Sequence, residues 1–270
     1  MGIVNHESGA RYDRIGTRYR GVRLPEPRIA ALIEDALGDA VSVLNVGAGA
    51  GSYESPHRKV VALEPSETMI YQRAADAAPA IRGTAEALPF ADASVDACTA
   101  FLTVHHWTDQ EKGLRELRRV ARKRIVILTY VAGAIPRDQR WLTSVYFPAI
   151  AAADERLFPR ADTGLYQATL GPHEILPVPI PVDCVDGFLD AYWARPEAYL
   201  DPAVRAGISG LQLLPETELR EGLERLERDL ADGSWESRLG YLRTQATFDA
   251  GLRLVVAGPS PVTSIEPRSI

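Results

Sequence analysis

The feature that most constrains the fold is a glycine-rich turn that directly follows a buried strand. Residues 43–54 read VLNVGAGAGSYE, so an apolar run leads into Gly47, Gly49 and Gly51. Glycine at these positions lets the backbone approach a ligand more closely than any side chain would allow. The pattern predicts a strand, a tight turn and the start of a helix, with a nucleotide-like cofactor lying across the turn. The alternative interpretation is a tight strand-to-helix turn without a ligand.

Short β-branched runs alternate with helical stretches around this turn. Strands are expected at 41–46, 59–64, around 81, within 95–104 and at 124–131, and helices at 29–37, at 66–75 and from Thr108 or Asp109 through 120. Such alternation is typical of a parallel sheet that is covered by helices on both faces. The first half of the chain therefore predicts an α/β fold.

The second half of the chain has a weaker pattern. Helices are expected at 141–158 and 215–230, a proline-punctuated edge strand at 176–184 and a last strand at 252–257. Leucines at 219, 223, 226 and 230 form one stripe, which is typical of a core-facing helix side. We expect an N-terminal arm and first helix (1–40), a cofactor-binding core (41–135), the remaining strands with a helical acceptor-recognition insertion (136–258) and a loose tail (259–270).

Composition narrows the class of partner. The chain has 36 acidic against 30 basic side chains, a formal net charge of -6, which argues against a broad nucleic-acid surface. Its two cysteines, Cys98 and Cys184, do not form a secreted disulfide framework, which favours a cytoplasmic location. The longest apolar run, 125–134, is about half of the roughly 20 residues that a membrane span requires. We expect a small-molecule partner and neither a nucleic acid nor a membrane.

The glycine spacing distinguishes between cofactors. The dinucleotide fingerprint is GxGxxG, whereas here the third glycine comes one residue early and Ser52 occupies the expected place. A nicotinamide-dependent oxidoreductase is therefore disfavoured. Glu64 ends the next strand, KVVALE, where a carboxylate can accept hydrogen bonds from both hydroxyls of a ribose. A solvated charge at the strand end is the alternative interpretation of Glu64.

Four motifs occur in the order VLNVGAGAG, VVALEPS, GTAEALPFADASVDA and TVHHWTD. This ordered set, from about residue 41 to 131, resembles the class I (Rossmann-like) S-adenosylmethionine-dependent methyltransferases of the small-molecule type. The resemblance implies a Rossmann-like, seven-stranded, mostly parallel sheet with an antiparallel last strand and helical cap elements. It also implies S-adenosyl-L-methionine as cofactor and methylation of an oxygen, nitrogen or carbon of a metabolite. The alternative is a protein that binds this cofactor structurally or electrostatically, without methyl transfer.

The resemblance also assigns the expected cofactor contacts, which lie at the ends of neighbouring strands: Asn45, Gly47, Ala48, Gly49, Gly51, Glu64, Pro65, Met69, Thr84, Ala85, Glu86 and Phe101. The glycine turn would frame the methionine and ribose portions, and Glu64 would hold the ribose diol. Pro65 and Met69 would lie near the adenine. Asn45 and Thr84 depart from the family pattern, because acidic residues are usual there. Glu86 is expected to take over the adenine contact.

The residues after the fourth strand, 101–107, should face the methyl group, because ligands of open α/β sheets lie beyond the carboxyl ends of the strands. His105 and His106 stand there, and imidazole is the commonest general base near neutral pH. Both are candidate catalytic residues, with His105 slightly preferred. The alternative is that one of them caps the next helix or packs beside Trp107. The other three histidines show no metal-ligand spacing, so no metal site is expected.

Acceptor recognition is expected outside the common core, since similar cores serve many acceptors. Aromatic-lined pockets often hold flat organic ligands. The candidates are therefore aromatic or basic: Tyr12, Tyr19, Arg23, Trp107, Trp141, Tyr146, Tyr192 and Trp193. Ordinary packing is the alternative for each of them. For Asp183, Asp186 and Asp190 the alternative is that they cap a helix.

Overall fold

The computed structural model describes residues 23–160 and 164–258, and its centre is a seven-stranded sheet. The strands are β1 (Ser42–Val46), β2 (Lys59–Glu64), β3 (Ala80–Arg82), β4 (Val95–Phe101), β5 (Ala121–Tyr130), β6 (His173–Pro177) and β9 (Leu252–Ala257). Their order is β3-β2-β1-β4-β5-β9-β6, and β9 runs antiparallel to both β5 and β6. The expected mostly parallel sheet with an antiparallel last strand is confirmed.

The strand order reverses between β1 and β4, and this switch point places the ligand crevice. From β1 the sheet proceeds to β2 and β3 on one side and to β4 and β5 on the other. The connections after β1 and β4 therefore diverge at the carboxyl ends of these strands, which opens a crevice there. Leu44 of β1 pairs with Cys98 of β4, and both are fully buried. The crevice thus rests on a rigid, buried support.

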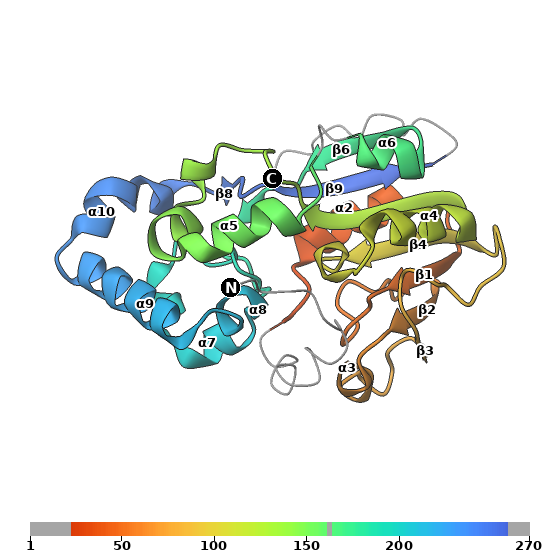
Figure 1. The fold of residues 1–270 in the computed structure, drawn as a ribbon, viewed down its shortest axis with the longest axis horizontal. Helices are drawn as coiled ribbons and strands as arrows, with labels where there is room; N and C mark the ends of the chain where they lie inside the picture. The colour runs from red at the N-terminus through yellow and green to blue at the C-terminus, as the bar shows by residue number, and fades with distance from the viewer. Residues whose placement is uncertain (1–22, 161–163, 259–270) are drawn as a thin grey trace.

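Helices cover both faces of the sheet (Figure 1). On one face, α2 (Pro27–Leu37) buries Ile29 and Ile33, and Gly38 ends it with a φ of 54°. On the other face, α4 (Gln110–Val120) buries Leu114 and Leu117 and packs against α6 (Leu165–Leu170). Asp109 caps α4, because its carboxylate accepts a hydrogen bond from the Lys112 amide at 2.9 Å. The short helix α3 (Glu67–Tyr71) follows β2.

A group of helices lies beyond one end of the strands, on the left in Figure 1. It contains α5 (Pro148–Leu157), α7 (Pro202–Ala206), α8 (Ser209–Gln212), α9 (Glu216–Ala231) and α10 (Ser234–Leu239). The small sheet of β7 (Ile180–Pro181) and β8 (Thr247–Phe248) connects this lobe to the rest. Leu226 of α9 is fully buried and the other stripe leucines pack against the same core, which confirms the expected core-facing side. None of the described helices combines the length and apolarity that crossing a membrane requires.

Three local expectations are wrong. No helix follows the glycine turn, since residues 47–58 pass through turns directly into β2. The helix expected at 141–158 is broken into the π-helical turn η4 (Leu142–Tyr146) and α5, because Pro148 cannot donate a helical hydrogen bond and starts a new helix instead. The strand expected at 176–184 is divided between β6 and β7, since its prolines lack the donors of a continuous ladder.

Candidate active site

A cavity of about 860 Å³, here called cavity A, lies at the carboxyl ends of β1, β2 and β4. All predicted cofactor contacts except Gly51 line it. They are joined by residues that sequence analysis did not assign to the cofactor: Arg23, Ala50, Ser52, Tyr53, Leu102, Thr103, His106 and Trp107. The crevice expected from the strand order is therefore a real cavity, and the glycine turn forms one wall.

The glycines of the turn are required by conformation, and Gly47 also by space. Gly47 has a φ of 68°, and a Cβ atom there would lie 2.1 Å from the Thr103 Oγ1. Gly49 has a φ of 53° and Gly51 a φ of 99°, in the left-handed region that other residues rarely adopt. The turn thus brings bare backbone to the cavity wall.

Glu64 is held in position at the end of β2, where it is only 5% exposed. Its carboxylate accepts hydrogen bonds from the Gly49 amide at 2.8 Å and from the Ser66 amide at 2.9 Å. An ionised carboxylate can accept about four hydrogen bonds, the type of contact that the hydroxyls of a ribose donate. The same side chain that would bind the ribose also fixes the glycine turn.

A buried acidic residue stands beside Asn45, where the family pattern has an acid. The Asn45 amide nitrogen donates to the Glu54 carboxylate at 3.1 Å. Glu54 forms an ion pair with Arg73 at 2.6 Å, and Arg73 also donates to the Gly49 carbonyl at 3.1 Å. The ion pair of Glu54 and Arg73 therefore stabilises the glycine turn. Sequence analysis missed both, because their pairing is set by the loop that replaces the expected helix.

Glu86 lines cavity A but is also engaged with the protein backbone. Its Oε1 accepts hydrogen bonds from the Thr108 amide at 2.8 Å and from the Asp109 amide at 3.3 Å. Glu86 therefore fastens the loop after β3 to the start of α4. Its contact with an adenine ring stays a prediction.

A second cavity of about 1010 Å³, here called cavity B, adjoins cavity A. Arg23, Leu102 and His106 line both cavities, so these residues form the junction. The other walls come mainly from α5, α8 and the loop after β7, and most of their side chains are apolar: Ala149, Ile150, Ala153, Leu157, Phe158, Phe188, Leu189, Ile208, Leu213 and Leu214. Cavity A, with its glycine-turn wall, and the mostly apolar cavity B thus meet at these three residues.

The two histidines occupy different positions in the short helix η2 (Val104–His106). His106 lies at the junction, whereas His105 lines only cavity B. Their rings are in contact, with centroids 3.8 Å apart, and the His105 ring also lies 4.5 Å from the Phe158 ring. The geometry therefore favours His106 over His105, the reverse of the preference from sequence.

The structure brings only part of the predicted acceptor set to the cavities. Arg23 lies at the junction and Trp107 lines cavity A, while Tyr12 and Tyr19 lie outside the described residues. Trp141 and Tyr146 are buried in the core with their rings edge to face, and the Trp193 indole donates to the Ile180 carbonyl at 3.1 Å. The Arg195 guanidinium covers the Tyr192 ring. These last four aromatic residues line neither cavity, so their assignment to the acceptor is corrected to packing.

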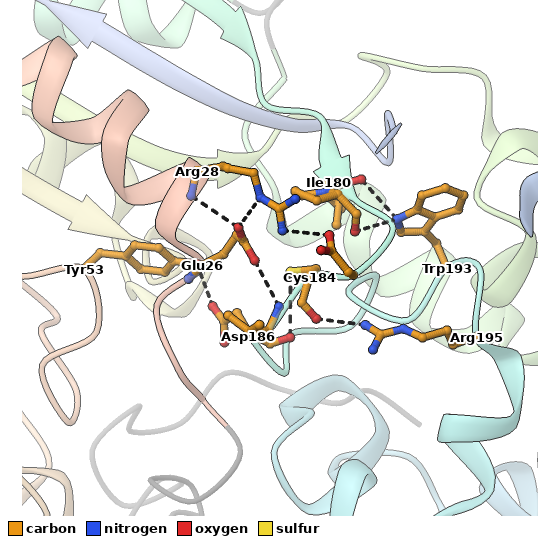
Figure 2. A network of polar contacts seen from close by, with 11 residues as sticks. Glu26, Arg28, Tyr53, Ile180, Cys184, Asp186, Trp193 and Arg195 are labelled. Atoms are coloured by element: carbon orange, nitrogen blue, oxygen red, sulfur yellow. Dashed lines mark hydrogen bonds and ion pairs between the residues drawn. The ribbon is translucent and has the colours of Figure 1, made fainter. Parts of the chain in front are cut away.

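A buried polar network around Glu26 and Asp186 connects Tyr53 to the loop after β7 (Figure 2). Asp186 is fully buried and accepts hydrogen bonds from Arg23 at 2.6 Å and from the Tyr53 hydroxyl at 2.8 Å. Glu26 is buried beside it and accepts from the Val185 amide at 3.0 Å. Although burial raises the pKa of Glu26, hydrogen bonds from Arg28 and the Val185 amide hold it below its usual value.

This network corrects the interpretation of the three aspartates as helix caps. Asp186 binds Arg23, Asp190 binds Arg140 at 3.1 Å, and Asp183 binds Arg28 at 2.8 Å. Burial, with the Asp186 charge beside it, raises the pKa of Tyr53 well above its usual value, so the hydroxyl stays a donor. Within the part of the chain that the structure describes, no group of three or more His, Cys, Asp or Glu side chains is placed to hold a metal ion.

A glycine-walled cavity at the switch point of this sheet, with a strand-end carboxylate facing it, defines a Rossmann-like enzyme that binds a nucleoside cofactor. Comparison with known proteins specifies the class further. Residues 44–128 match a family model described as a methyltransferase domain. The crystal structure of a candidate methyltransferase from an antibiotic biosynthesis pathway of Anabaena variabilis is 33% identical, with a TM-score of 0.80 over 87% of this chain and 98% of that chain. The chain belongs to the S-adenosylmethionine-dependent methyltransferase family.

Two further relatives show how far the similarity extends. A malonyl-[acyl-carrier protein] O-methyltransferase of Erwinia pyrifoliae is 42% identical over 91 residues, which is 32% of this chain. The match spans only 35% of that relative's length. The [4+2]-cyclase SpnF is 16% identical with a TM-score of 0.52, covering 96% of this chain and 98% of that chain, and shows a shared fold alone.

The cofactor is S-adenosylmethionine, and the residues of cavity A fit it. Gly47 leaves free the space that a Cβ atom would fill, and the Glu64 carboxylate, an acceptor of the kind that a ribose diol requires, lines the same cavity. Met69 and Pro65 add apolar surface to the same wall. The glycine spacing also differs from the fingerprint of proteins that bind the pyrophosphate of a dinucleotide.

We expect Glu64→Ala to lower the affinity for S-adenosylhomocysteine by about 10- to 100-fold, since hydrogen bonds to a charged group contribute about 1.5–3 kcal/mol. Calorimetric titration measures this affinity. Glu67→Ala is the matched control, because Glu67 begins α3 only three positions away and does not line cavity A. Undiminished affinity in a folded Glu64→Ala protein would show that the ribose lies elsewhere.

Proposed function

We propose that this protein transfers the methyl group of S-adenosylmethionine to a small-molecule metabolite whose apolar body binds in cavity B. The observation that carries the proposal is the junction at which Arg23, Leu102 and His106 line both cavities. When bound, the cofactor supplies an electrophilic methyl group attached to a sulfonium. Alignment of two reactants in adjoining cavities contributes about 7–11 kcal/mol to such a displacement, so positioning is the main task of the protein.

His106 is proposed as the group that accepts a proton from the acceptor. It stands at the junction, and a neutral imidazole nitrogen there takes the proton of a hydroxyl as the new O–C bond forms, or deprotonates an ammonium group before its nitrogen attacks the methyl carbon. The His105 ring packs against His106 on one side and Phe158 on the other, so it fixes the orientation of His106. The apolar walls of cavity B exclude water from this place.

The activity of the Erwinia pyrifoliae relative does not identify the acceptor of this chain. Its 91 matched residues amount to 35% of that protein, so the similarity is too short to carry a substrate across. The apolar walls of cavity B, rather than this match, support the proposal of a small molecule.

The proposal is tested with S-adenosylmethionine labelled in its methyl group and a panel of apolar phenols, amines and carboxylic acids. We expect label in one class of acceptor, with S-adenosylhomocysteine as the second product. Cofactor binding without transfer to any class would overturn the proposal.

With the acceptor found in this way, we expect His106→Gln to lower kcat by about 10²- to 10⁴-fold, the usual contribution of general base catalysis. Its cofactor affinity should stay close to that of the unchanged protein. The rise of kcat with pH that a general base produces should also disappear. His105→Gln serves as the comparison and should lower kcat less while keeping the pH profile. Equal effects of both variants on the profile would contradict the assignment of the base to His106.

A further inference from the structure

Cavity B is apolar over most of its surface, but a cluster of charged and polar side chains interrupts one wall. The cavity is lined there by three residues: Tyr130 at the end of β5, Arg140 before η4, and Asp154 in α5. Polar groups placed in an otherwise apolar pocket commonly fix the orientation of a ligand. This cluster has no part in the methyl-transfer chemistry proposed above.

The cluster contains more negative than positive charge. The Arg140 guanidinium binds Asp154 at 2.6 Å and Asp190 at 3.1 Å, so two carboxylates share one cation. Asp190 is buried behind the wall, with a side chain 4% exposed, whereas Asp154 lines the cavity and is 16% exposed. Among the described residues, Arg140 is the one cation that forms an ion pair with Asp154. The wall therefore presents a carboxylate whose charge is only partly compensated.

The Asp154 carboxylate also accepts few hydrogen bonds from the protein. Over the described ranges, the one hydrogen bond to the Asp154 side chain is that from Arg140 to Oδ2. Burial raises the pKa of Asp154 to about 6, against the opposing effect of Arg140 and with a further contribution from the Asp190 charge. A ligand that donated a hydrogen bond from a cationic group would supply both the missing charge and the missing donor.

Of these two cavities, Asp154 lines only cavity B, whereas the junction with cavity A is formed by Arg23, Leu102 and His106. The Phe158 ring lies 4.5 Å from the His105 ring and 5.3 Å from the Tyr130 ring. The Arg140 guanidinium lies 4.9 Å from the centroid of the Tyr130 ring, and the same guanidinium forms the ion pair with Asp154. A group bound at Asp154 is therefore not the atom that receives the methyl group.

We infer that the acceptor has a protonated amine at the end of its apolar body remote from the methylated atom, and that Asp154 binds this amine. The inference rests on the proposed function, because it takes cavity B as the acceptor site. It makes Asp154 a specificity-determining residue. Amphipathic amines are then favoured over alcohols and carboxylic acids of the same length.

The test uses octylamine, octan-1-ol and octanoate, which share one apolar body and differ in the head group. Calorimetric titration with S-adenosylhomocysteine present measures their binding to the full chain at pH 7.5. We expect octylamine to bind about tenfold or more tightly than octan-1-ol, and octanoate to bind most weakly, since hydrogen bonds between charged groups exceed neutral ones by about this factor. In Asp154→Asn the preference for octylamine over octan-1-ol should fall to about threefold or less.

Asp190→Asn is the matched control, because Asp190 binds the same guanidinium but does not line cavity B. It should keep the order of the three probes. An equal loss of preference in both variants would overturn the inference, since Asp154 would then act only by holding Arg140. Tighter binding of octanoate than of octylamine, or no binding of any probe, would overturn it as well. None of these outcomes depends on methyl transfer, so failure here is distinguishable from failure of the proposed function.

Discussion

Replacement of Gly47 by alanine is expected to lower methyl transfer by about 100-fold or more, because a displacement of about 1 Å at a reacting site can have this effect. The new Cβ atom would lie 2.1 Å from the Thr103 Oγ1 and 2.9 Å from the Thr103 Cβ. Either the glycine turn or Thr103 must move, and both line cavity A. The free energy of unfolding should fall by about 2–5 kcal/mol, the sum of left-handed strain and overpacking. Urea denaturation and calorimetric titration with S-adenosylhomocysteine measure the two effects separately.

Gly233→Ala is the control for Gly47→Ala, because it introduces left-handed backbone strain without a steric clash of the new Cβ atom. Gly233 has a φ of 79°, close to the 68° of Gly47, but a Cβ atom there would meet nothing within 4 Å. It should cost about 1–2 kcal/mol of stability and leave cofactor affinity unchanged. A partial recovery of affinity in Gly47→Ala/Thr103→Ala would confirm that Thr103 is the obstacle. Similar cofactor affinities in Gly47→Ala and Gly233→Ala would contradict the proposed role of the turn.

The parts of the fold that could be predicted from sequence are those whose signal is local. β2 and β9 begin and end at the expected residues, since each is a short run of β-branched and apolar side chains with polar or glycine neighbours. Most residues that line cavity A were predictable for the same reason, because they lie at or directly after the ends of β1, β2, β3 and β4. The helix expected after the turn does not form, since three glycines and Pro56 within twelve residues oppose a helix.

The acceptor side could not be predicted, because its residues are sorted by contacts between distant segments. Trp141 looked like a ligand-binding aromatic residue, yet it packs against Trp235 with ring centroids 5.6 Å apart. Arg23 and Asp186 are separated by 163 positions, and no periodicity in either segment indicates that they pair. Asp154 lines cavity B from α5, a helix that begins at Pro148 and not at the expected residue 141. Tertiary packing thus decides which polar side chains face the acceptor.

The second large effect is expected for Asp186→Ala, which should lower the free energy of unfolding by about 3–5 kcal/mol, as for other broken buried ion pairs. The Asp186 carboxylate is fully buried and binds the Arg23 guanidinium, the Tyr53 hydroxyl and the Gly187 amide. Without it, a buried cation and a buried hydroxyl both lose an acceptor that they share. Because Arg23 and Tyr53 line cavity A, the affinity for S-adenosylhomocysteine should fall together with stability.

Two further variants identify the cause of that loss. Asp183→Ala removes an exposed aspartate of the same loop, whose side chain is 71% exposed and pairs with Arg28, and should change stability little. Arg23→Met in the Asp186→Ala background removes the cation that has lost this ion pair, so the double variant should be more stable than Asp186→Ala alone. If the second substitution instead destabilised the protein further by its full individual effect, Arg23 and Asp186 would act independently. The junction between the two cavities would then owe its shape to packing and not to this ion pair.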